Sequence, residues 1–207
     1  MIRFWNAFVK ITGWPAYYAC FFPKYTYEDK AVQGRRIKGP AIIVSNHTTV
    51  FDYALFLFVF WTRTLRYQMA ELLFEKKFLG RLLRSLGGIY IDRASSNLAF
   101  MGESARILQK GGVVGIFPEG RLPKDDETAP IEFRPGAAYL SISTGVKVIP
   151  VYTDGNYFKF KRTRVAIGVP MDPDEYCDPS RGQKENIEAF AIAMREKVIE
   201  LRSMIDG

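Results

Sequence analysis

One histidine and one aspartate, five residues apart, are the side chains of this 207-residue chain best suited to acid–base chemistry. His47 is the only histidine, and Asp52 is the only charged residue in the stretch 51–61. A carboxylate in such apolar surroundings is costly unless a partner neutralises it. We therefore predict that His47 lies in a loop and contacts Asp52 in the first turn of a helix, which Thr48 or Thr49 caps.

Such a pair can work as a general base and the group that orients it. Asp52 would hold one ring N–H of His47 and leave the other nitrogen free to take a proton. Two plainer interpretations stay open from these residues alone: a structural histidine, and an acid that favours the helix dipole. The two cysteines, Cys20 and Cys177, lie far apart and form no CxxC. With one histidine, this composition excludes a disulfide framework and a thiolate zinc site, and we expect no metal and no cofactor.

The elements that must position this pair follow from hydrophobic patterning. Short apolar, β-branched runs predict strands at 41–44, 65–69, 88–91, 113–117, 146–151 and 165–169. Helix-like stretches lie between them at 52–61, 71–85, 98–109 and 136–143, and a last helix has apolar residues at helical spacing from Ile187 to Ile205. Strands that alternate with helices predict an α/β fold with a mostly parallel or mixed central sheet covered by helices. We expect residues 31–207 to form this domain.

The first 30 residues differ from the rest by their aromatic side chains, which recur from Phe4 to Phe22. Lys10, Gly13 and Pro15 interrupt the run, so it is a poor candidate for a membrane span. Tryptophan and tyrosine favour the membrane–water interface. We predict a short N-terminal segment of one or two helices, broken near residues 13–15, that lies in the membrane surface. The alternative is that these aromatic side chains pack on the protein's own core.

Further motifs follow the His–Asp pair in a fixed order. They are Asn46-His47-x4-Asp52, then Gly88-Ile89-Tyr90-Ile91-Asp92-Arg93, then Phe117-Pro118-Glu119-Gly120-Arg121 with Phe133-Arg134-Pro135-Gly136 behind it, and Val148-Ile149-Pro150-Val151. Together they resemble the motifs of the glycerol-phosphate and lysophospholipid acyltransferases, whose best-known branch is the 1-acylglycerol-3-phosphate acyltransferases. The resemblance implies transfer of an acyl group from acyl-CoA or acyl-carrier protein to a hydroxyl of a phosphate-bearing lipid.

The resemblance also implies roles for individual residues. His47 would deprotonate the acceptor hydroxyl, which attacks the thioester directly, and Asp52 would orient His47. The acceptor and its phosphate would be bound by residues at the strand ends: Arg93, Glu119, Gly120, Arg121 and Arg134. Two further residues are candidates for support. Asn46 is a candidate oxyanion donor, and Gly136 lies at an expected helix start, where backbone N–H groups favour anions.

The third motif departs from the family pattern. Many members carry one residue between its glycine and its arginine, whereas here Arg121 follows Gly120 immediately. The side chain therefore points in a different direction. A guanidinium binds phosphate through two parallel hydrogen bonds, so the direction matters. Arg134 is the alternative partner for the phosphate, and the two arginines stay open as candidates.

The charge pattern indicates an anionic partner. The formal net charge is +7, and residues 1–110 hold all of the excess. Lys77, Arg81 and Arg84 share one helical face, which could lie on anionic lipid or contact the acyl donor. No zinc finger or RNP-like pattern is present, which argues against nucleic acid. We expect a phospholipid surface, acyl-CoA or acyl-carrier protein, and a lysophospholipid as partners, with the protein peripheral or monotopic on the cytoplasmic face of a membrane.

The function that we predict is membrane-associated O-acylation of a lysophospholipid. The default acceptor is 1-acyl-glycerol-3-phosphate, and its product is phosphatidic acid. Three alternatives remain: acylation of glycerol 3-phosphate or another lysolipid, hydrolysis of the thioester with water as acceptor, and non-catalytic lipid binding on the same fold.

Overall fold

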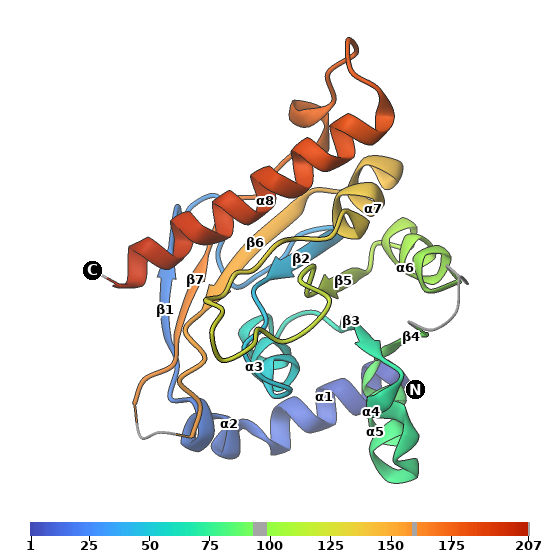
Figure 1. The fold of residues 1–207 in the computed structure, drawn as a ribbon. Helices are drawn as coiled ribbons and strands as arrows, with labels where there is room; N and C mark the ends of the chain where they lie inside the picture. The colour runs from blue at the N-terminus through green and yellow to red at the C-terminus, as the bar shows by residue number, and fades with distance from the viewer. Residues whose placement is uncertain (93–98, 159–160, 207) are drawn as a thin grey trace.

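The computed structural model describes residues 1–92, 99–158 and 161–206 as a layered α/β structure around a seven-stranded sheet (Figure 1). The strands are β1 (Lys24–Tyr27), β2 (Ala41–Ser45), β3 (Leu65–Ala70), β4 (Ile89–Ile91), β5 (Val113–Ile116), β6 (Val148–Thr153) and β7 (Arg164–Ile167). Their order across the sheet is β1-β7-β6-β2-β5-β3-β4. The pairs are parallel except for β6 with β7. This topology confirms the predicted fold class.

Helices cover both faces of the sheet. The helices are α1 (Ile2–Thr12), α2 (Trp14–Phe21), α3 (Asp52–Val59), α4 (Leu72–Glu75), α5 (Lys77–Leu86), α6 (Ala99–Gln109), α7 (Gly136–Thr144) and α8 (Gln183–Asp206), with a 3-10 turn at Pro173–Tyr176. Side chains of β2 alternate between two separate cores. Ile43 packs into the core beneath α2 and α3, whereas Ile42 and Val44 pack into the core beneath α6, α7 and α8.

The predicted strands and helices are present, with three differences. The stretch expected as one helix at 71–85 is two helices, α4 and α5, because Lys76 adopts an extended backbone between them. The segment after Asp172, for which no element is predicted, contains the 3-10 turn. Strand β1 was not expected, since Lys-Tyr-Thr-Tyr carries no aliphatic residue, yet it forms an edge of the sheet. The first 30 residues therefore contribute a strand to the sheet.

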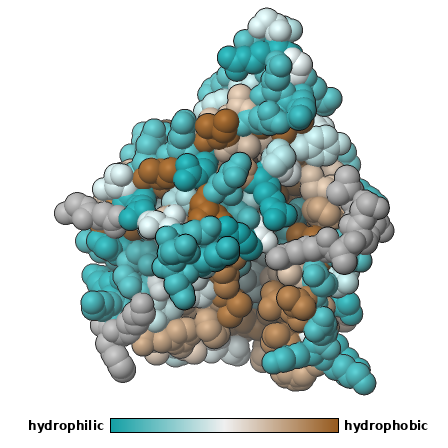
Figure 2. Space-filling model, in the orientation of Figure 1, coloured by the Kyte–Doolittle hydropathy of each residue, from teal (hydrophilic) through white to brown (hydrophobic). Residues whose placement is uncertain are grey.

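The N-terminal helices are divided between the core and the surface. The break predicted near residue 13 is confirmed, because α1 ends at Thr12 and α2 begins at Trp14. Tyr17 and Phe21 are buried, and Tyr17 stacks on Phe58 of α3 at 4.6 Å between ring centroids. Other apolar residues of these helices are exposed: Phe4, Phe8, Ile11 and Tyr18. In Figure 2, apolar side chains gather on the lower part of the molecule, around α1, α2 and α5.

Within the described residues, no helix combines the length and hydrophobicity that crossing a bilayer requires.

Candidate active site

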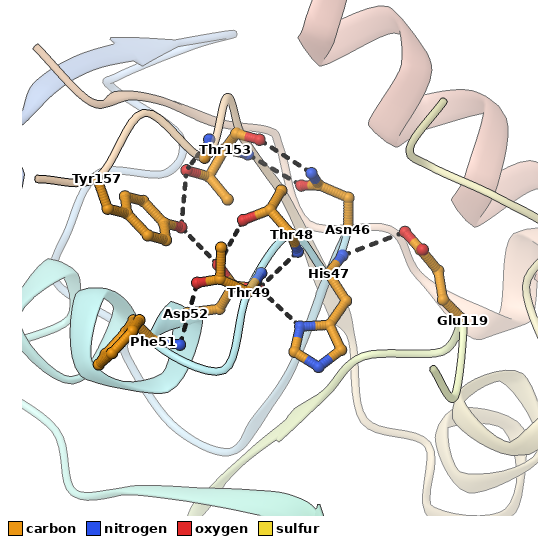
Figure 3. A network of polar contacts seen from close by, with 10 residues as sticks. Asn46, His47, Thr48, Thr49, Phe51, Asp52, Glu119, Thr153 and Tyr157 are labelled. Carbon is orange, nitrogen blue, oxygen red and sulfur yellow. Dashed lines mark hydrogen bonds and ion pairs between the residues drawn. The ribbon is translucent and has the colours of Figure 1, made fainter. Parts of the chain in front are cut away.

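The candidate site lies where β2, β5 and β6 end (Figure 3). These three strands are parallel neighbours with β2 in the middle, so their carboxyl ends meet at one edge of the sheet. In the sheet, β5 lies on one side of β2 and β6 on the other. Open α/β sheets bind ligands at such a point, where connections leave toward opposite sides of the sheet. Three segments converge there: 46–52 after β2, 117–121 after β5 and 153–157 after β6.

The predicted contact between His47 and Asp52 is present. Nδ1 of His47 lies 2.6 Å from Oδ2 of Asp52, the first residue of α3. The Asp52 side chain is fully buried, whereas that of His47 is 20% exposed. The imidazole also stacks on the ring of Phe117 at 4.3 Å, with the planes 9° apart. Two contacts thus fix the ring, and Nε2 points away from Asp52 without a hydrogen-bond partner in the described part of the chain.

The carboxylate of Asp52 is surrounded by donors. Oδ2 accepts the backbone N–H of Thr48 at 2.7 Å and of Thr49 at 3.0 Å, besides the imidazole. Oδ1 accepts the hydroxyl of Thr48 at 2.7 Å and that of Tyr157 at 2.6 Å. Hydrogen bonds of this kind favour the ionised form of a buried carboxylate and offset its desolvation. Asp52 is thereby held in one orientation toward His47.

The expected helix cap is wrong. Phe51 takes the N-cap position of α3, and no side chain caps the helix there. The hydroxyl of Thr49 accepts the N–H of Phe51 at 3.1 Å, and Thr48 donates to Asp52 instead. The two threonines therefore serve the carboxylate and its loop: the Thr48 hydroxyl donates to Asp52, and the Thr49 hydroxyl accepts from Phe51 rather than from the first N–H groups of α3.

Asn46 joins the ends of β2 and β6. Its amide nitrogen donates to the carbonyl of Thr153, and its amide oxygen accepts the N–H of Thr153, both at 2.9 Å. The side chain is completely buried. This arrangement supports a bracing role for Asn46, and its role as an oxyanion donor stays a prediction.

Glu119 approaches His47 from the end of β5. Its Oε1 accepts the backbone N–H of His47 at 3.2 Å, while Oε2 is buried and makes no hydrogen bond of normal geometry in the described part of the chain, although the backbone N–H of Ile131 interacts with the carboxyl. Burial raises the pKa of the Glu119 carboxyl to about 7. Buried polar atoms are nearly always hydrogen-bonded, so the Oε2 atom of Glu119 keeps an acceptor position that a ligand could use.

The two candidate arginines differ in what they contact. Arg121 forms a two-pronged ion pair with Glu127, at 2.5 and 2.6 Å. These bonds lower the pKa of Glu127 to about 2. Arg134 lies across Gly120, whose backbone has φ +70°, and a Cβ at Gly120 would come within 2.8 Å of Arg134 Nε. The Arg134 side chain is exposed and makes no ion pair among the residues that the structure describes.

The remaining predicted site residues are Arg93 and Gly136. Arg93 lies outside the described residues. Gly136 is the first residue of α7, as expected, and is exposed. Its anion-binding role stays a prediction.

The family model called Acyltransferase matches residues 24–154, a span that includes His47, Asp52, Glu119, Arg121 and Arg134. The chain belongs to the acyltransferase family. It is 24% identical over 148 residues to a Bacillus subtilis protein named 1-acyl-sn-glycerol-3-phosphate acyltransferase, covering 69% of this chain and 71% of the relative. It is 26% identical over 179 residues to a Haemophilus influenzae protein of the same name, covering 83% and 73%.

Two further relatives are longer, and one solved structure shares the fold. The chain spans about half of the length of similarly named proteins from Borreliella burgdorferi and Homo sapiens. The 1-acyl-sn-glycerophosphate acyltransferase PlsC of Thermotoga maritima superposes with a TM-score of 0.68 at 22% identity, covering 95% of this chain and 79% of PlsC. The architecture is therefore that of a known acyltransferase structure.

The sequence alone did not reveal two residues of this candidate site. Tyr157 and Thr153 contact each other through their hydroxyls at 3.2 Å, and Tyr157 also reaches Asp52. Both follow the fourth motif, but they are more than a hundred residues from the His–Asp pair. No periodicity or spacing in the sequence joins positions so far apart. Only the neighbouring places of β2 and β6 in the sheet bring them together.

Proposed function

We propose that this acyltransferase moves a fatty acyl group onto the free hydroxyl of a lysophospholipid. We take 1-acyl-glycerol-3-phosphate as the preferred acceptor and phosphatidic acid as its product. The observation that carries the proposal is the fixed His47–Asp52 pair, whose Nε2 has no partner among the described residues, at a strand edge that also holds Glu119 and Arg134. The names of the relatives support this choice of acceptor.

The chemistry follows from the orientation of the imidazole. Nε2 of His47 takes the proton of the acceptor hydroxyl as its oxygen attacks the thioester carbonyl of the donor. The C–O bond forms, the tetrahedral intermediate collapses, and the C–S bond breaks. His47 then returns its proton to the departing thiolate. Asp52 holds Nδ1–H throughout and stabilises the imidazolium, so that no acyl-enzyme intermediate is needed.

The acceptor phosphate is assigned to Arg134 rather than to Arg121. The guanidinium of Arg121 already satisfies a carboxylate at Glu127, whereas Arg134 has no such partner among the described residues. Glu119 presents Oε2 beside His47. With its pKa raised to about 7 by burial, this carboxyl can accept from a hydroxyl when ionised or donate to a phosphate oxygen when protonated.

We further propose that acyl-CoA or acyl-carrier protein is the donor and that no cofactor takes part. The reaction as written needs only a thioester, a hydroxyl and one proton carrier. The exposed basic face of α5, with Lys77, Arg81 and Arg84, supports a contact with CoA phosphates, an acidic carrier or anionic lipid.

The decisive experiment compares the wild type with His47→Ala on an acceptor panel. The panel is 1-acyl-glycerol-3-phosphate, glycerol 3-phosphate, lysophosphatidylcholine and no acceptor, each with either donor, and products are identified by mass. We expect phosphatidic acid from the first acceptor and a loss of about 10³-fold or more in kcat for His47→Ala. An unimpaired His47→Ala variant would refute the general base. Acyl release that is independent of any acceptor would instead identify a thioesterase.

We also propose that the protein binds the cytoplasmic face of a membrane through α1 and α5. Exposed Phe4, Phe8 and Ile11 on α1 lie beside α5, to which Asn6 is joined by a hydrogen bond at the carbonyl of Leu86. Apolar side chains next to a basic helix suit an anionic phospholipid surface.

Vesicle sedimentation tests this membrane contact. The double variant Phe4→Ser/Phe8→Ser should lose most of its binding to anionic vesicles. The control, Ile192→Ser, changes an equally exposed apolar residue on α8 and should bind as the wild type does. Equal binding by all three proteins would exclude α1 as the contact.

A further inference from the structure

Tyr157 is a buried residue whose hydroxyl reaches the base–orienter pair. Its side chain is 4% exposed, and its O–H donates to Oδ1 of Asp52 at 2.6 Å (Figure 3). Among the described residues, the hydroxyl of Thr48 is the other donor to that oxygen. A short hydrogen bond to a buried carboxylate is charge-assisted and stronger than one between neutral groups.

The surroundings of Tyr157 fix where its hydroxyl lies. Its ring packs edge-on against Phe21 of α2 at 5.0 Å between centroids, and its hydroxyl also contacts Thr153 at 3.2 Å. The turn before it is pressed onto the histidine loop. At Gly155, which has φ +67°, a Cβ would come within 2.9 Å of Thr48. The next residue is held too, because the N–H of Phe158 donates to the carbonyl of Cys20 at 2.8 Å.

We propose that Tyr157 is a positioning residue for the general base: its hydroxyl fixes the Asp52 carboxylate and shares its charge, and so sets how strongly Asp52 stabilises protonated His47. The proposal rests on the proposed function, in which His47 is the base. A residue that only filled space would not need a hydroxyl at this point, since phenylalanine has the same ring.

Several titratable groups face Asp52, and Tyr157 must be separated from them. His47 lies against Oδ2, Tyr67 of β3 and Glu119 lie near enough for their charge to interact with it, and Tyr157 lies against Oδ1. Burial and the negative charge of Asp52 both raise the pKa of Tyr157 well above its usual value. Tyr157 therefore keeps its proton over the working pH range and acts as a constant donor to Asp52.

Removal of the hydroxyl changes the charge that His47 experiences. In Tyr157→Phe the carboxylate keeps more of its negative charge for the imidazole. His47 should then hold its proton up to a higher pH, by about one pH unit. The acidic limb of the kcat/KM profile should move upward by the same amount. At neutral pH, kcat should fall about tenfold with little change in the KM for the acceptor, because a larger share of His47 is then protonated and the Asp52 carboxylate, with one donor fewer on Oδ1, is oriented less firmly.

The matched control is Tyr53→Phe. Tyr53 follows Asp52 directly on α3, but its hydroxyl donates to the carbonyl of Leu86 at 3.1 Å and does not contact the carboxylate. His47 is the only histidine of the chain, so its ring signals in an NMR titration of the substrate-free full chain report on this residue alone. We expect the midpoint to rise in Tyr157→Phe and to match the wild type in Tyr53→Phe.

A double-mutant cycle separates action through Asp52 from a general structural effect. In an Asp52→Asn background, Tyr157→Phe should change kcat less than twofold, because the carboxylate through which the Tyr157 hydroxyl acts is no longer there. An unchanged His47 midpoint and pH profile in Tyr157→Phe would overturn the proposal. So would an equal tenfold loss in the Asp52→Asn background. If His47→Ala is inactive while Tyr157→Phe behaves as wild type, only this inference fails; an active His47→Ala would refute the proposed function itself.

Discussion

The ends of β2 and β5 form the two halves of the site, and they differ in how completely their polar atoms are satisfied. After β2, Asp52 accepts from five donors and the amide of Asn46 is engaged on both atoms. After β5, Glu119 has a buried oxygen without a partner, and Arg134 is exposed without an ion pair among the described residues. Under the proposed function, this contrast means that the base is built before the substrate arrives, whereas the acceptor side is completed by the substrate.

This division has an energetic reason. A base must be aligned when the hydroxyl arrives, and alignment made during folding does not have to be made again in the transition state. A binding group must instead keep hydrogen-bonding capacity for its ligand, and Glu119 and Arg134 do so at the cost of incomplete bonding in the free protein. Arg121 lies between these cases, because Glu127 occupies it and releases it only if that pair opens.

The strongest test of the prebuilt half is Asp52→Asn. An amide cannot accept from all five donors and favours the wrong tautomer of His47, so kcat should fall by about 10³–10⁴-fold. Steady-state kinetics with saturating donor and acceptor measure it, and the near-ultraviolet circular dichroism spectrum shows whether the fold is kept. A loss below tenfold in a folded variant would mean that Asp52 does not orient the base.

The acceptor half is tested by Arg134→Ala. Loss of a charged partner for the phosphate should raise the KM for 1-acyl-glycerol-3-phosphate about 10–100-fold and leave kcat nearly unchanged. The same change at Arg121 should have the smaller effect, because Arg121 is held by Glu127. A monoacylglycerol, which has no phosphate, should not distinguish Arg134→Ala from wild type. If Arg121→Ala raises this KM more than Arg134→Ala does, Arg121 is the residue that binds the phosphate.

The unsatisfied carboxyl of Glu119 should be visible in stability as well as in catalysis. Burial raises the pKa of Glu119 to about 7, whereas an unfolded glutamate titrates near about 4.3. The folded state therefore binds this proton more tightly, and its contribution to stability is present below pH ~4.3 and is lost as the pH rises through ~7. The free energy of unfolding of the wild type should fall, relative to that of Glu119→Gln, by about 1–3 kcal/mol over this range.

Denaturant unfolding of both proteins at about pH 5 and pH 8 measures this difference. A difference between wild type and Glu119→Gln that is the same at both pH values would show that the carboxyl titrates normally, and the contrast between the two strand ends would lose one of its supports.

The smallest effect is expected at the intermediate pair. Glu127→Gln releases Arg121 from a surface ion pair, and such pairs contribute little to stability. The KM for the phosphorylated acceptor should therefore fall by no more than about threefold as Arg121 becomes available. Initial rates across acceptor concentration measure it, with Glu132→Gln as the control on an exposed acid of the same loop. A rise in KM would show that Glu127 itself supports the acceptor site.

Much of the scaffold could be predicted because its signals are local. The buried strands β2, β5 and β6 are continuous apolar runs, and α8 shows helical periodicity. The contact between His47 and Asp52 was predictable for the same reason, since five residues across a loop–helix junction leave few geometries. Strand β1 was not, because its exposed edge position selects no aliphatic residues.

The remaining contacts depend on the topology of the sheet. Tyr157 and Thr153 meet the histidine loop only because β6 lies next to β2, which no local pattern specifies. The pairing of Arg121 with Glu127 required the charged loop to fold back on itself, as the bond from the N–H of Lys124 to Glu127 shows.

The packing of the N-terminal helices limits how this enzyme can be shortened. Removal of a segment with exposed apolar side chains is a common way to obtain a more tractable protein. Here the same helices supply Tyr17 and Phe21 to the core, and Lys10 binds the carbonyls of Trp61 and Arg63 beyond α3. A chain cut before β1 would open the wall behind Tyr157. Production of this protein should therefore keep the whole N-terminus and use detergent or lipid nanodiscs to cover its apolar side.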